Sequence, residues 1–199
     1  MSEFDKPALP GPGLFESRAA AEDPAVRSEA GLRVATLLVR GTNGSDDREL
    51  VDRVLNLTDE HGLDLVTELW AHFPADSLPG ALWRLYVLRA WVRREPARAA
   101  REFAAGKRFS PVDEVVAGVV DPPGPDEVAH LVDSVIRGIV TGDLSDILDR
   151  AAAFARVVGI GRANLGEDPP NSTESAARLV ETATALQNAA RHERLGSLR

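Results

Sequence analysis

Hydrophobic residues recur at the three- and four-residue spacing of amphipathic helices along most of this chain. In residues 126–141 they fall at positions 0, 3, 4, 7, 8, 11 and 12 counted from Val128, which places them on one helical face. A second stripe follows the break at Gly142-Asp143. Two such stripes joined by a short break predict an antiparallel helical hairpin. The stripes consist of Val128, Leu131, Val132, Val135, Ile136, Ile139 and Val140, and of Leu144, Ile147, Leu148, Ala151, Phe154, Ala155 and Val158.

Proline, glycine and capping residues divide the remaining chain into shorter helices. Asp23-Pro24 is typical of a helix start, and Pro96 indicates that a new helix begins after an apolar helix over 81–95. That apolar helix is hydrophobic around most of its circumference, which predicts a central position. Further helices are predicted over 24–40, 46–62, 63–73, 96–105 and 112–119, and from Ser172 or Thr173 to a frayed end near Gly196. A loop is predicted at Gly159, Gly161, Gly166, Pro169 and Pro170.

These segments predict an all-α fold, a single compact bundle of about 7–9 helices. Residues 24–199 form the predicted all-helical domain. Residues 1–23 are rich in proline and glycine with little periodicity, which predicts a flexible N-terminal arm. The one plausible strand is Val115 to Val120, and a single strand has nothing to pair with.

Composition narrows the chemistry and the compartment. The 199 residues include 44% hydrophobic and only 5% aromatic residues, so the core must consist mainly of leucine, valine and alanine. The absence of cysteine excludes disulfides and thiolate chemistry and fits a reducing compartment. No apolar leader or membrane-spanning run of about 20 residues is visible. We therefore expect a cytoplasmic protein with no membrane contact.

Charge is strongly segregated along the chain, although the net charge is −8. Residues 45–75 and 110–149 carry net charges of −6 and −8, while residues 76–109 carry +5. Arginines interleaved with aromatic residues are typical of nucleic-acid binding, but Pro96 and the helical phase divide them into separate groups. Pairing with acids inside the fold or across a subunit boundary is therefore favoured over nucleic-acid contact. The candidate nucleic-acid residues are Arg84, Arg89, Arg93, Arg94, Arg98 and Arg101.

Motifs for catalysis or metal binding are weak. Glu127 and His130 form a single Glu-x-x-His pair, whereas a di-iron bundle needs two, and His130 falls opposite the apolar stripe. Gly159-Ile160-Gly161 follows a predicted helix and lacks the spacing of a dinucleotide loop. His61 precedes Gly62 at a helix end, and His72, next to Phe73, favours core packing. We expect no metal and no cofactor.

The sequence therefore favours a non-enzymatic interaction protein that forms homo-oligomers or docks a protein partner through a helical face. One alternative is a nucleic-acid-associated or regulatory protein that uses the basic segment 84–108. A second alternative is a small-ligand-binding or enzymatic domain with a pocket between helices. The candidate residues of that pocket are Trp70, His72, Trp83, Tyr86 and Trp91.

Overall fold

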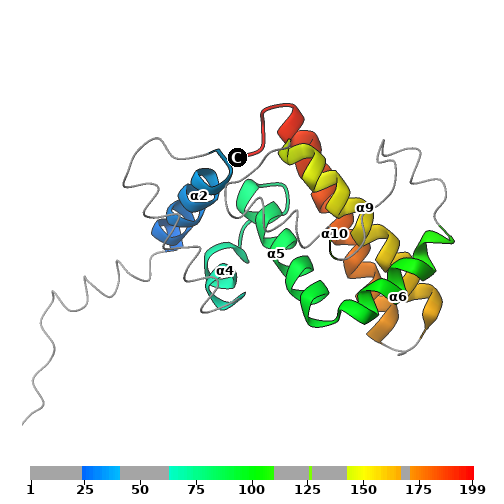
Figure 1. The fold of residues 1–199 in the computed structure, drawn as a ribbon. Coiled ribbons are helices and arrows are strands. Elements are labelled where there is room, and N and C mark those ends of the chain that lie inside the picture. The colour runs from blue at the N-terminus through cyan, green and yellow to red at the C-terminus, as the bar shows by residue number, and fades with distance from the viewer. Residues whose placement is uncertain (1–23, 41–62, 110–125, 127–142, 167–170) are drawn as a thin grey trace, which may run out of the picture.

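The computed structural model describes residues 24–40, 63–109, 126, 143–166 and 171–199, in which all regular structure is helical (Figure 1). The prediction of an all-α fold is confirmed for these ranges, which contain no strand. The arm over 1–23, the first stripe of the 126–158 hairpin and the segments 46–62 and 112–119 lie outside them. Within the described ranges there are six helices: α2 (Pro24–Arg40), α4 (Leu63–Trp70), α5 (Leu78–Arg94), α6 (Pro96–Lys107), α9 (Leu144–Leu165) and α10 (Asn171–Arg194).

Helix α5 occupies the centre, with α2 and α4 on one side and α6, α9 and α10 on the other (Figure 1). Its start is fixed by Ser77, whose hydroxyl accepts a hydrogen bond from the backbone N–H of Gly80 at 3.2 Å. Pro96 begins α6 one residue after α5 ends. The central position expected from the hydrophobic circumference of α5 is confirmed, since nine of its residues are buried.

On one side, α5 packs against α2 and α4 through a hydrophobic core that includes aromatic rings. Trp70 is 1% exposed, and its Nε1–H donates to the carbonyl oxygen of Gly31 at 2.9 Å. The rings of Trp70 and Tyr86 lie with centroids 5.8 Å apart. Because a side chain at Gly31 would meet the Leu69 carbonyl at 2.8 Å, glycine allows α2 to approach α4 closely.

On the other side, α9 and α10 form an antiparallel pair that α6 crosses. Arg156 of α9 donates to Gln187 of α10 at 2.9 Å, and Arg194 pairs with Asp149. The crossing of α6 over α9 is very close, because a Cβ at Gly161 would lie 1.7 Å from the carbonyl oxygen of Glu102. Direct backbone contact of this kind requires glycine.

The predicted loop at Gly159 and Gly161 is wrong, because α9 continues through both residues to Leu165. Glycine serves here as a contact residue between helices rather than as a helix breaker. The helix ends at Gly166, whose φ of 58° is the left-handed conformation typical of a helix C-terminus. Pro169 and Pro170 lie outside the described residues.

No helix in the described ranges is long and apolar enough to cross a lipid bilayer.

Candidate functional site

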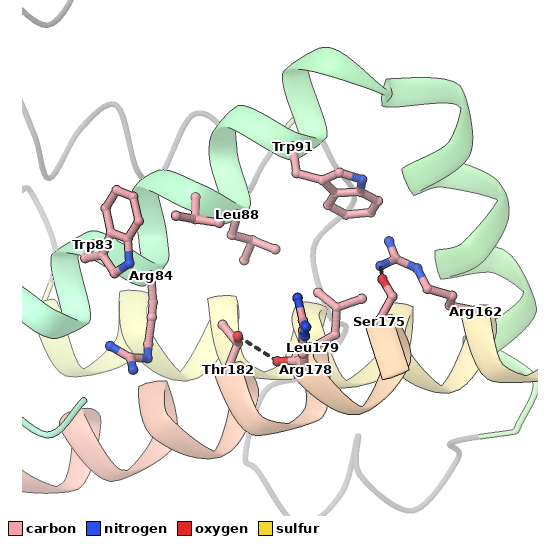
Figure 2. A pocket seen from close by; sticks show the side chains of 10 residues that line it. Trp83, Arg84, Leu88, Trp91, Arg162, Ser175, Arg178, Leu179 and Thr182 are labelled. Atoms are coloured by element: carbon pink, nitrogen blue, oxygen red, sulfur yellow. Dashed lines mark hydrogen bonds between the residues drawn. The ribbon is translucent and has the colours of Figure 1, made fainter. Parts of the chain in front are cut away.

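A pocket of about 390 Å³ lies between α5 and α10, with α9 closing one end (Figure 2). This volume is at the lower end of the range that small-molecule sites occupy. None of the ten described residues that line it is acidic. They are Trp83, Arg84, Val87, Leu88 and Trp91 of α5, Arg162 of α9, and Ser175, Arg178, Leu179 and Thr182 of α10.

The helical repeat explains why these residues face one another. The α5 residues follow a spacing of three to four, from Trp83 through Val87 to Trp91, so they share one face. The α10 residues Ser175 to Thr182 do the same. At 1.5 Å per residue, the lining spans about two helical turns, or roughly 10–12 Å. Figure 2 shows Trp83 and Arg84 at one end of this slot and Trp91 and Arg162 at the other.

The Arg162 end is a buried ion pair. Arg162 donates from Nε and Nη2 to the carboxylate of Glu102 at 2.8–3.0 Å, and the two side chains are only 8% and 5% exposed. Its Nη1 donates to the hydroxyl of Ser175, and its guanidinium carbon lies 4.9 Å from the ring centroid of Trp91. These contacts hold the Arg162 side chain in one position against α6, α10 and α5.

Glu102 is shared between two arginines. Besides Arg162, it accepts a hydrogen bond from Nε of Arg98 at 2.8 Å, and Arg98 also pairs with Glu95 at 3.1 Å. The side-chain hydrogen bond to Glu102 raises the pKa of Arg98 above its ordinary value. A carboxylate with several charged donors is stable inside the fold because its lone pairs are satisfied.

The Arg84 end is built differently. Nη1 of Arg84 donates to the carbonyl oxygen of Gly80 at 2.8 Å, one turn earlier in the same helix. Burial lowers the pKa of the partly buried Arg84 guanidinium, and the charge of Asp76 opposes this shift. Within the described residues, Arg84 forms no ion pair with a carboxylate. It therefore carries a desolvation cost that is only partly compensated.

The remaining polar groups come from α10. Arg178 pairs with Glu174 at 2.6 Å, but both side chains are largely exposed, at 73% and 67%, so water screens the pair. The Thr182 hydroxyl donates to the carbonyl oxygen of Arg178 at 2.8 Å (Figure 2). Leu179 lies between them in sequence and, with Leu88, supplies the apolar middle of the slot.

The structure separates the five residues that the sequence grouped into one candidate pocket. Trp83 and Trp91 line the slot, whereas Trp70 and Tyr86 pack together in the core on the other side of α5. His72 is exposed, with its ring 4.6 Å from that of Phe73 and 3.4 Å from the Ser28 hydroxyl. The expectation that His72 packs in the core is therefore wrong.

Sequence reasoning missed the part of the slot that α9 and α10 contribute. Arg162 fell in a segment assigned to a loop, and Ser175, Arg178 and Thr182 carry no motif. Their spacing of three and four on a predicted helix was the one available signal. Such spacing indicates that the three residues share one helix face, but it does not indicate which helix packs against that face.

The candidate nucleic-acid residues have different surroundings. Arg84 lines the slot and Arg98 is paired with Glu95 and Glu102. The other four are solvent-accessible to different degrees: Arg89 is partly buried, and Arg93, Arg94 and Arg101 are exposed.

Among the described residues, no group of three or more histidine, cysteine, aspartate or glutamate side chains could hold a metal ion. The Glu127–His130 pair and His61 lie outside the described ranges.

Comparison of the chain with protein-family models, with curated proteins and with solved structures finds no match.

Proposed function

We propose that this chain is a small-ligand-binding domain whose α5–α10 slot takes an amphipathic molecule with a flat apolar body. The observation that carries the proposal is the pairing of two tryptophans with two leucines along one open slot of about 390 Å³. Tryptophan side chains bury large flat surfaces, and small-molecule sites are mostly apolar with a few placed polar groups. The slot has both features.

Binding is favoured over catalysis by the residue types in the slot. The ten described lining residues include no histidine, aspartate, glutamate or lysine. These are the side chains that most often transfer protons in enzymes. Arginine, tryptophan, serine and threonine can orient a ligand, and neither hydroxyl has a described base beside it to activate it.

Two threonines of α10 provide a variant that blocks the slot and a control that does not. Thr182 and Thr184 both lie on α10, and each hydroxyl donates to the carbonyl four residues earlier, at 2.8 and 2.9 Å. Thr182 lines the slot, whereas Thr184 is exposed. We expect Thr182→Trp to fill the slot, and Thr184→Trp is the matched control.

The test is a thermal-shift titration with three compounds of one shape, namely 4-phenylbutyrate, 4-phenylbutyramide and 4-phenylbutylamine. We expect at least one of them to raise the Tm of the wild-type chain and of Thr184→Trp, because binding to the folded state alone stabilises it. The shift should disappear in Thr182→Trp. The proposal is overturned if none of the three raises the Tm, or if Thr182→Trp retains the full shift.

Self-association stays a separate proposal from the sequence, and Phe109 and Leu195 are the most exposed of the large apolar side chains in the described ranges. Size-exclusion chromatography with light scattering tests it, and a strict monomer at high protein concentration would exclude homo-oligomers.

The nucleic-acid proposal is tested by gel shifts at several salt concentrations. It fails if Arg89→Glu combined with Arg93→Glu leaves binding unchanged.

A further inference from the structure

The three arginines of the slot differ in how their charge is compensated, and this difference identifies the ligand class if the proposed function holds. Arg162 faces the buried carboxylate of Glu102 through both Nε and Nη2. The wider group of Arg98, Arg162, Glu95 and Glu102 contains two positive and two negative charges. An anion at this end would therefore meet a cluster that is already neutral.

The positive charge of Arg178 is compensated by an exposed ion pair. Its partner Glu174 lies one turn earlier on α10, and both side chains are open to solvent. Water and salt screen a charge in that position, so it contributes little to the affinity for an anion.

Arg84 is the exception. It is partly buried against the slot, and its described hydrogen bond goes to a neutral backbone carbonyl at 2.8 Å. A guanidinium has five N–H donors, so one carbonyl leaves most of its hydrogen-bonding capacity unused. The charge of Asp76 offsets only part of the cost of burying the Arg84 guanidinium, and an anion that binds Arg84 directly would remove more of that cost. The lowered pKa of Arg84 reflects the same burial.

The rest of the slot defines where the body of such a ligand lies. From Arg84, the apolar surface continues along Leu88 and Leu179 to Trp91 at the far end (Figure 2). The far end is about seven residues, or roughly 10 Å, along α5 from Arg84. One face of the Trp91 ring is covered by the Arg162 guanidinium, which holds the ring in place.

We infer that the ligand is an organic monoanion whose carboxylate binds Arg84 and whose flat apolar body lies along Leu88 and Leu179 towards Trp91. A planar carboxylate fits the fork of an arginine with two parallel hydrogen bonds. A second acid group at the other end gains nothing, because Glu102 already neutralises Arg162.

The test is isothermal titration calorimetry with 4-phenylbutyrate, its neutral amide and the dianion 4-(4-carboxyphenyl)butyrate. Charge-assisted hydrogen bonds to a partly buried arginine correspond to about a 10- to 100-fold gain in affinity. We therefore expect 4-phenylbutyrate to bind about 10- to 100-fold more tightly than the amide. The dianion should bind no more tightly than 4-phenylbutyrate.

Substitutions of Arg84 test whether the carboxylate of the ligand binds at that residue. Arg84→Met should reduce the affinity for 4-phenylbutyrate to that for the amide, and Arg84→Lys should restore part of the difference. The matched control is Arg94→Met, which removes an exposed arginine of the same helix outside the slot and should change the affinity less than about threefold. Circular dichroism and the thermal midpoint show whether each variant is folded.

The outcomes separate this inference from the proposed function. If the amide binds as tightly as 4-phenylbutyrate, or if Arg84→Met leaves the difference between them intact, the slot binds ligands but the inference is overturned. A dianion that binds tenfold more tightly overturns it as well, because Arg162 would then hold a second acid group. If none of the compounds binds, the proposed function itself fails.

Discussion

The α6–α9 crossing and the α5–α10 slot are both contacts between helices beside Arg162, yet one is closed and the other open. At the crossing, Gly106 and Gly161 bring two backbones into contact, and Glu102 is buried beside them. At the slot, Trp83 and Trp91 stand between the helices on the α5 side. Small residues let helices meet, and large ones keep a space between them that side chains only partly fill. We therefore expect the crossing to contribute mainly to stability, whereas the slot is the proposed ligand site.

The largest effect is expected from removing the charge of Glu102 at the closed crossing. Glu102→Gln leaves the buried Arg162 without its counter-charge, which should lower the free energy of unfolding by roughly 3–5 kcal/mol. Urea denaturation measures this loss. Arg162→Met should cost less, because Glu102 keeps its hydrogen bond to the more exposed Arg98.

A double variant sharpens this prediction. Replacing both partners, as Glu102→Leu with Arg162→Met, removes the buried charges together and should recover most of the stability that Glu102→Gln loses. A Glu102→Gln protein within about 1 kcal/mol of wild type would show that the pair does not hold the crossing.

Filling the closed crossing should have the next largest effect. In Gly161→Ala the new Cβ would lie 1.7 Å from the Glu102 carbonyl oxygen, so the two backbones must separate. We expect a loss of about 2–3 kcal/mol in urea denaturation. Gly159→Ala in the same helix is the control, because its new Cβ would meet the nearest atoms at 3.1–3.2 Å, where a shift of a few tenths of an ångström suffices, and alanine favours the helix. Equal losses in the two variants would argue against backbone contact at Gly161.

A smaller, pH-dependent effect is expected at the start of α9. The carboxylate of Asp143 accepts a hydrogen bond from the backbone N–H of Ser145 at 2.7 Å, which lowers its pKa below the ordinary value of 3.8. This stabilisation is therefore complete above the ordinary pKa and is lost as the pH falls through the lower pKa of the folded state.

Asp143→Ala should accordingly reduce stability by about 1 kcal/mol at pH 7. The difference from wild type should shrink as the pH falls below about 4. Asp143→Asn retains a capping oxygen at every pH and is the control. A difference for Asp143→Ala that is independent of pH between 2 and 7 would contradict the role of the charged cap.

The smallest stability change is expected in the slot. Arg84→Met should leave the free energy of unfolding within about 0.5 kcal/mol of wild type, because Arg84 has no described ion pair to lose. Urea denaturation beside the Glu102→Gln protein checks this contrast. A loss as large as that of Glu102→Gln would mean that Arg84 serves the fold rather than a ligand.

The helix starts and the central place of α5 could be predicted from the sequence because they depend on local signals. Pro24 and Pro96 begin helices where they are expected to, and the apolar circumference of α5 predicts its central place. Gly161 could not be read in this way. Glycine has the same low helix propensity in a loop and in a tight helix crossing, so only the packing of α6 on α9 separates the two.

The lining of the slot could be predicted only in part from the sequence, for a similar reason. Trp83 and Trp91 could be singled out as large aromatic residues, but Trp70 could not be assigned to the opposite side of α5 before the helices were packed. Arg162 and Glu102 are 60 residues apart in the chain. No local pattern predicts such a pair, although it decides which end of the slot remains positively charged.

The most direct test uses the three tryptophans of the chain, because Trp83 and Trp91 line the slot and Trp70 lies in the core on the other side of α5. The indole N–H signals of Trp70, Trp83 and Trp91 can be followed by NMR during a titration with 4-phenylbutyrate. We expect the signals of Trp83 and Trp91 to shift together with one dissociation constant, while the signal of the buried Trp70 stays in place. A shift at Trp70 alone, or no shift at Trp83 and Trp91 at saturating ligand, would contradict it.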